Sequence, residues 1–141
     1  MCGIAGFINL DGQPVSLPLL KKATDEIMHR GPDGEGHWIE GNIGLGHRRL
    51  SIIDLSPAGQ QPMVSSDDRY ILTYNGEVYN YGELKKELLS AGYSFSGQSD
   101  TEVVLAACTI WGVRKAVDRM IGMFAFSIWD RRLNKLSLVR D

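Results

Sequence analysis

The second residue of the chain is a cysteine, directly behind the initiator methionine. Removal of Met1 would leave Cys2 with a thiol and a free α-amine on the same residue. A thiol has an ordinary pKa of about 8.5 and needs a base to become a good nucleophile at neutral pH. An α-amine, with an ordinary pKa of about 7.7–8.0, can be that base. Position 2 therefore allows nucleophilic catalysis, although Cys2 could equally be a small hydrophobic residue.

An aromatic and β-branched stretch, residues 69–75, ends at Asn75, and Gly76 follows it. These two residues are possible oxyanion donors. An Asn amide and a Gly backbone N–H side by side can stabilise developing negative charge. Asn-Gly is also a frequent hairpin turn. Glu77 continues the extended pattern beyond the pair, so both interpretations stay open.

Two charged groups could bind the ends of an amino acid. Arg48 and Arg49 close a predicted strand, and strand alternation directs them to opposite faces, one solvated and one toward a cleft. A guanidinium can bind a carboxylate in bidentate fashion. Asp100 begins a predicted helix, where it complements the helix dipole or binds an ammonium group. The alternative for either arginine is a surface salt bridge.

Other reactive residue types carry weaker signals. The three histidines, His29, His37 and His47, lack metal-ligand spacing and are predicted to be structural. Cys108 lies within a predicted helix and is expected in the core. No glycine-rich phosphate-binding motif follows a predicted strand.

Composition limits the class of protein. The 141 residues favour one domain, and a net charge of -2 with a pI of about 5.9 gives no reason to expect nucleic acid or a membrane surface as partner. Two cysteines are too few for a disulfide framework. Without a long apolar segment or a signal-peptide pattern, we expect a cytoplasmic protein.

The elements that must position these residues alternate irregularly between strand and helix patterns. Strands are predicted at residues 2–10, 69–75, 122–130 and 135–141, with a hairpin at 37–53 around residues 40–42. Helices are predicted at 16–30, 80–92 and 99–112, the last two beginning with capping boxes, Asn80 with Glu83 and Ser99 with Glu102. Residues 54–68 form a long polar loop. This order indicates an α+β fold with mainly antiparallel sheet.

The motifs MCGIAGF, HRGPDGEG, GHRRLSIIDLSPAGQQPM, YNGEVYNY, SDTEVVL and GMFAFSIWD resemble, in this order, one known family. It is the glutaminase domain of glutamine-dependent asparagine synthetases, a class II glutamine amidotransferase of the N-terminal nucleophile hydrolase type. The resemblance covers essentially all 141 residues. It implies a four-layer α/β/β/α sandwich of mainly antiparallel sheets.

The resemblance also implies a role for each candidate residue. Cys2 would attack the side-chain amide of glutamine, and Asn75 and Gly76 would form the oxyanion hole. Arg49 would hold the α-carboxylate and Asp100 the α-ammonium. The remaining substrate-binding positions would be Leu50, Ile52, Ile53 and Glu77.

The implied reaction converts L-glutamine and water into L-glutamate and ammonia through a Cys2 thioester. The resemblance implies no cofactor in this domain. ATP and Mg²⁺ would serve a separate C-terminal synthetase domain. That domain would use the ammonia to make asparagine from aspartate and would be this domain's partner. A homodimer is a further expectation. Because the last predicted strand stops at Asp141, we expect a glutaminase domain over residues 1–141 that is truncated at its C-terminus. A different ammonia acceptor, or a non-catalytic glutamine-binding fragment, stays open.

Overall fold

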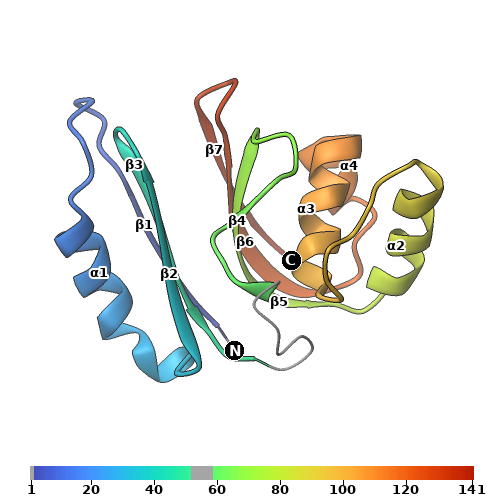
Figure 1. The fold of residues 1–141 in the computed structure, drawn as a ribbon, viewed down its shortest axis with the longest axis horizontal. Coiled ribbons are helices and arrows are strands. Elements are labelled where there is room, and N and C mark those ends of the chain that lie inside the picture. Colours follow the sequence, from blue (N-terminus) through green and yellow to red (C-terminus); the bar gives the residue numbers. More distant parts are fainter. Residues whose placement is uncertain (1, 52–58) are drawn as a thin grey trace.

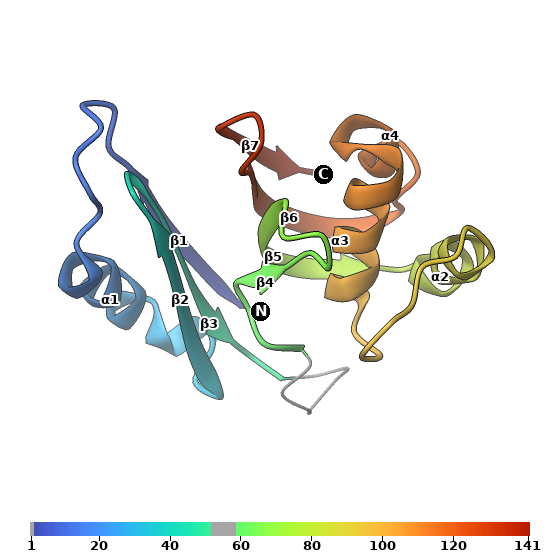
Figure 2. The same cartoon turned by 45° about the horizontal axis from the view of Figure 1, so that its top comes forward.

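Two antiparallel sheets lie face to face between two layers of helices (Figure 1). The structure, a computed structural model, describes residues 2–51 and 59–141. Helix α1 covers one sheet, and α2, α3 and α4 lie on the far side of the other (Figure 1). Figure 2 shows the same separation of the helices by the sheets after a 45° turn. The α+β prediction and its four layers are confirmed.

The first sheet has the order β1-β3-β2, with β1 at Gly3–Ile8, β2 at Gly34–Glu40 and β3 at Ile43–Arg49. The predicted hairpin around residues 40–42 is confirmed, because Glu40 pairs with Ile43 across the turn. Gly41 has a φ of +54°, a conformation that glycine adopts at little cost. This hairpin sets the face from which each β3 side chain projects.

Helix α1, Leu17–Glu26, packs closely on this sheet. Ser16 caps its first turn, and Leu20 and Thr24 are buried. A Cβ on Gly46 of β3 would lie 2.5 Å from Thr24 Cγ2, so only glycine permits this approach. The helix ends before the predicted residue 30, and a 3₁₀ turn η1, Met28–Arg30, follows it.

The second sheet has the order β4-β5-β6-β7: β4 at Met63–Val64, β5 at Tyr70–Val78, β6 at Gly122–Asp130 and β7 at Lys135–Arg140. Strand β4 lies within the predicted loop 54–68. Strand β5 runs through Asn75 and Gly76, which pair with Ala125 and Phe124 of β6. The hairpin-turn interpretation of Asn75-Gly76 is therefore wrong.

The main hydrophobic core lies between this sheet and its helices, α2 at Tyr81–Ser90, α3 at Asp100–Trp111 and α4 at Val113–Val117. Cys108 is fully buried in it, as predicted. In the described part of the chain, no helix has the length and apolarity needed to cross a lipid bilayer.

One predicted capping box is absent and the other is half formed. The Asn80 side chain does not cap α2; it donates to Arg119 O and accepts from Ile121 N, both at 2.9 Å. Ser99 Oγ does accept from Glu102 N, but the Glu102 carboxylate binds the N–H groups of Ser96 and Gly97. The Asn80 side chain therefore binds main-chain groups about forty residues away and not, as the local pattern predicts, the first turn of α2.

Candidate functional site

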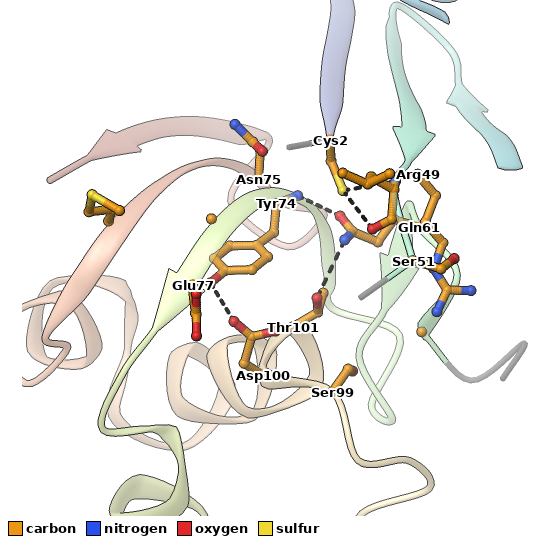
Figure 3. A pocket seen from close by; sticks show the side chains of 14 residues that line it. Cys2, Arg49, Ser51, Gln61, Tyr74, Asn75, Glu77, Ser99, Asp100 and Thr101 are labelled. Atoms are coloured by element: carbon orange, nitrogen blue, oxygen red, sulfur yellow. Dashed lines mark hydrogen bonds between the residues drawn. The ribbon is translucent and has the colours of Figure 1, made fainter. Parts of the chain in front are cut away.

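A cavity of about 290 Å³ lies where the start of β1, the end of β3, the middle of β5 and the start of α3 meet (Figure 3). Seven of the nine site residues predicted from the sequence line it: Cys2, Arg49, Leu50, Asn75, Gly76, Glu77 and Asp100. The other two, Ile52 and Ile53, lie outside the described residues. The chain thus gathers candidates separated by up to about a hundred positions into one pocket.

Cys2 is half-buried and lies against the backbone that follows β3. Its Sγ accepts a hydrogen bond from Leu50 N at 3.4 Å and lies 3.7 Å from Leu50 O, to which the thiol can donate. Arg30 Nε donates to Cys2 O at 3.1 Å. These contacts hold the thiol at the pocket wall and the main chain of Cys2 in place.

One edge of β5 faces the pocket beyond the end of β4. Along this edge Tyr74 N donates to Gln61 Oε1 at 2.5 Å, and Val78 N donates to Asp100 Oδ2 at 3.2 Å. In an antiparallel ladder, N–H groups two residues apart point to the same edge. The Gly76 N–H therefore projects between these two, and no acceptor for it is present among the described residues.

Asn75 presents its side chain on the opposite side of β5 from the Tyr74 ring (Figure 3). Its Oδ1 is buried and has no partner in the described part of the chain. Buried polar atoms are nearly always hydrogen-bonded, so an unpaired one is unusual. Asn75 Oδ1 is thus an unsatisfied acceptor, among the described residues, on a residue that lines the pocket.

Gly76 permits a close approach of two strands. A Cβ at this position would lie 2.4 Å from Met123 O and 2.5 Å from Phe124 Cα. Any side chain here would push β5 away from β6. The N–H that faces the pocket is thus held in place by packing on its other edge.

Asp100 is the first residue of α3 and is buried. Its Oδ2 accepts from the Tyr74 hydroxyl at 2.7 Å and from Val78 N. Burial, followed by the nearby Asp100 charge, raises the pKa of Tyr74 far above its ordinary value, so the phenol is a neutral donor. A carboxylate in this position can bind a cationic group in the cavity.

Arg48 and Arg49 lie on opposite faces of β3, as alternation predicts, but neither is simply solvated. Arg48 is buried under α1, where it pairs with Asp25 and with Glu35 at 2.8 Å. The expectation of one solvated arginine is therefore wrong. The small glycines of β3 bring the acidic last turn of α1 within reach, and this pairing offsets the burial of the charge. Arg49 lines the pocket.

The pocket residues that sequence reasoning did not assign to the site include Gln61, Tyr74, Thr101 and Met123. Gln61 is buried although it lies in the predicted polar loop, and its Nε2 donates to Thr101 Oγ1 at 3.4 Å. Nothing in the local sequence distinguishes it from Gln60. Tyr74 could have been found, because it directly precedes the predicted oxyanion donors Asn75 and Gly76 in the sequence.

His47 joins the two sheets. Its buried ring Nε2 lies 3.2 Å from Tyr74 O, to which it donates. Burial lowers the pKa of His47 from 6.5 to about 4, so the imidazole is neutral at neutral pH. The structural role expected for this histidine agrees with these contacts. No group of three or more His, Cys, Asp or Glu side chains in residues 2–51 and 59–141 is placed to hold a metal ion.

Comparison with known proteins gives concordant results. A family model described as a glutamine amidotransferase domain matches residues 1–141. Asparagine synthetase [glutamine-hydrolyzing] 2 of Bacillus subtilis is 44% identical over 144 residues, which span 100% of this chain and 19% of that protein. Amidase chry2 of Gibberella zeae is 39% identical over 153 residues, spanning 100% of the chain and 22% of that protein.

Among solved structures, the glutamine phosphoribosylpyrophosphate amidotransferase of B. subtilis matches with a TM-score of 0.80. The match covers 98% of this chain and 37% of that one, at 19% sequence identity, and it shows a shared fold. The chain spans about a fifth of the length of the curated relatives it matches. The full-length family match, together with the fold that it shares with a known amidotransferase, shows that this chain belongs to the glutamine amidotransferase domain family.

Proposed function

We propose that this domain hydrolyses the side-chain amide of L-glutamine to L-glutamate and ammonia, with Cys2 as the nucleophile. The observation that carries the proposal is the unpaired Gly76 N–H, which opens into the same cavity as the Cys2 thiol. A nucleophile and a preorganised donor in one pocket are the minimum that acyl transfer requires.

The reaction follows from the groups present once Met1 has been removed. The α-amine of Cys2 takes the proton from Sγ, and the thiolate attacks the amide carbon. The resulting oxyanion is stabilised by the Gly76 N–H and the Asn75 side-chain amide. Collapse breaks the C–N bond, and the protonated amine returns its proton to the leaving nitrogen, which departs as ammonia. Water then cleaves the thioester and releases L-glutamate.

The two ends of the pocket suit the two charges of an α-amino acid. Asp100 offers a buried carboxylate for the α-ammonium, and Arg49 offers a guanidinium for the α-carboxylate. Glu77, also in the pocket wall, adds a second carboxylate toward the amino end. Leu50 contributes the backbone that holds the thiol, and Ile52 and Ile53 stay predicted contributors.

For the whole protein we propose that the ammonia serves ATP-dependent synthesis of asparagine from aspartate. The support is the name of the B. subtilis relative, which is a glutamine-hydrolysing asparagine synthetase. ATP and Mg²⁺ would be used by a synthetase domain of the same protein. A homodimer and a cytoplasmic location stay predictions.

A different acceptor is the second candidate. A relative 39% identical to this chain is named an amidase and not an asparagine synthetase. The pocket residues serve glutamine, whatever receives the ammonia. The acceptor is decided by assaying the whole protein with ATP, ammonia and candidate acids, aspartate first.

Intact mass after treatment with 6-diazo-5-oxo-L-norleucine, a glutamine-like electrophile, tests the glutaminase. We expect one adduct per chain, mapped to Cys2 and prevented by excess L-glutamine, on protein confirmed to lack Met1. The variant Cys108→Ala should label normally, and Cys2→Ala should not label. No adduct on folded protein that lacks Met1 would refute catalysis and favour the non-catalytic fragment.

A further inference from the structure

Tyr74 is bound at three points by side chains from three other parts of the fold. Its N–H donates to Gln61 Oε1, its C=O accepts from His47 Nε2, and its hydroxyl donates to Asp100 Oδ2. All four residues are buried. The ring itself packs in the main core with residues of α3.

The main-chain contacts arise because β4 ends early. Strand β4 pairs only with Ile71 and Leu72, so the edge of β5 beyond them has no neighbouring strand. Gln61 and His47 occupy that edge with one acceptor and one donor. Since unsatisfied buried main-chain groups are costly, these two side chains fix where β5 lies relative to the first sheet.

The Tyr74 hydroxyl binds Asp100, which lies across the pocket from Cys2 (Figure 3). Among residues 2–51 and 59–141, Asp100 accepts two side-chain hydrogen bonds on the same oxygen, Oδ2, one from the phenol and one from Val78 N. Two donors on one oxygen set the rotation of the carboxylate about its last side-chain torsion. Within the described part of the chain, the second oxygen remains available to a cation in the cavity, which Asp100 lines.

We propose that Tyr74 is a positioning residue that makes this pocket selective for substrates with an α-ammonium group. Its phenol holds the Asp100 carboxylate in the orientation that receives the ammonium, and its fixed main chain holds the phenol. This inference rests on the proposed glutaminase function. It assigns Tyr74 no contact with the reacting amide.

The matched substrates are L-glutamine and glutaramate, which has the same amide and carboxylate but no α-amine. The quantity measured is the kcat/KM for L-glutamine divided by the kcat/KM for glutaramate. In Tyr74→Phe the ring and its packing stay, and only the hydroxyl is lost. We expect the ratio to fall about ten-fold or more through a higher KM for L-glutamine, because hydrogen bonds to charged groups are among the stronger ones. The kcat for L-glutamine should change little.

The control is Tyr70→Phe, which removes a phenol hydroxyl from the same face of β5, four residues from Tyr74 and outside the pocket. This variant should keep the ratio of the unmodified protein. A second control is Asp100→Asn, which should lose most of the discrimination. Adding Tyr74→Phe to it should then lower the ratio no further, since the phenol acts through Asp100.

An unchanged ratio in Tyr74→Phe, or an equal fall with and without Asp100, would overturn the inference. Calorimetric binding of L-glutamate against glutarate repeats the comparison without turnover. If the unmodified protein does not hydrolyse L-glutamine, the proposed function fails. The binding comparison then still decides the role of Tyr74, because a preference for L-glutamate that Tyr74→Phe leaves intact refutes it.

Discussion

His47 should make the folded protein progressively less stable as the pH falls below about 6.5. Burial lowers the pKa of this side chain from 6.5 to about 4. In the unfolded chain the imidazole takes up a proton near its ordinary pKa, whereas in the folded protein it stays neutral until much lower pH. Protons therefore bind the unfolded state first, and acid shifts the equilibrium toward unfolding.

The size of the effect follows from the two pKa values. Above pH 6.5 the histidine is neutral in both the folded and the unfolded state, so its titration does not change the free energy of unfolding. Between pH 6.5 and about 4 the free energy of unfolding falls, because each pH unit is worth about 1.4 kcal/mol. The decrease reaches about 2 kcal/mol near pH 5 and about 3 kcal/mol once the folded state is also protonated. Below about pH 4 both states are protonated, and His47 adds no further loss.

Urea unfolding at a series of pH values, compared between the unmodified protein and His47→Gln, measures this contribution. Glutamine keeps an N–H donor for Tyr74 O and does not titrate. Other titrating groups are common to both proteins and cancel in the difference. We expect the stability difference to shift in favour of the variant by about 2 kcal/mol between about pH 7.5 and about pH 5.

Equal acid slopes for the two proteins would refute the reasoning. That result would mean that His47 titrates alike in the folded and unfolded states, and its burial against Tyr74 would then be wrong. A variant that loses stability by the same amount at every pH would point to a packing defect alone. Only a difference that grows through this pH range supports the neutral buried imidazole.

Three further outcomes can be checked on the same protein. Iodoacetamide should modify Cys2 alone in the native state and both cysteines in urea, because burial raises the pKa of Cys108 to about 12; peptide mass mapping shows which reacts. Gly76→Ala should lower kcat for glutamine by about 10² or more, since its Cβ would lie 2.4 Å from a main-chain oxygen of β6 and displace an oxyanion donor. Gln61→Leu should lower the unfolding free energy by about 1–3 kcal/mol, measured in urea, because the buried Tyr74 N–H loses its acceptor.

Each of these has a result that contradicts it. Native labelling of both cysteines would show that the core around α3 opens readily. An active Gly76→Ala variant would mean that the strands separate without moving the donor, and that another group stabilises the oxyanion. A Gln61→Leu variant as stable as the unmodified protein would show that water replaces the amide at the strand edge.

Local patterns in the sequence determined much of the fold. The turn at residues 40–42 and the extended pattern that continues through Glu77 are set by neighbours within a few positions, and both predictions are confirmed. The proposal that Cys2 is a nucleophile with its own α-amine as base is also local, since it starts from the position of Cys2 next to Met1. The resemblance placed the other candidates, and the structure gathers the described ones in one cavity.

Only the tertiary structure decided which partners the polar side chains bind. Gln61 looked like a loop residue, Arg48 could have been solvated, and Asn80 looked like a helix cap, but each is bound by residues distant in the chain. The physical reason is that a buried polar group must find a partner, and the partner is set by how the sheets and helices pack. The short β4 leaves an edge that Gln61, His47 and Asp100 fill around the one N–H, that of Gly76, for which the described chain supplies no acceptor.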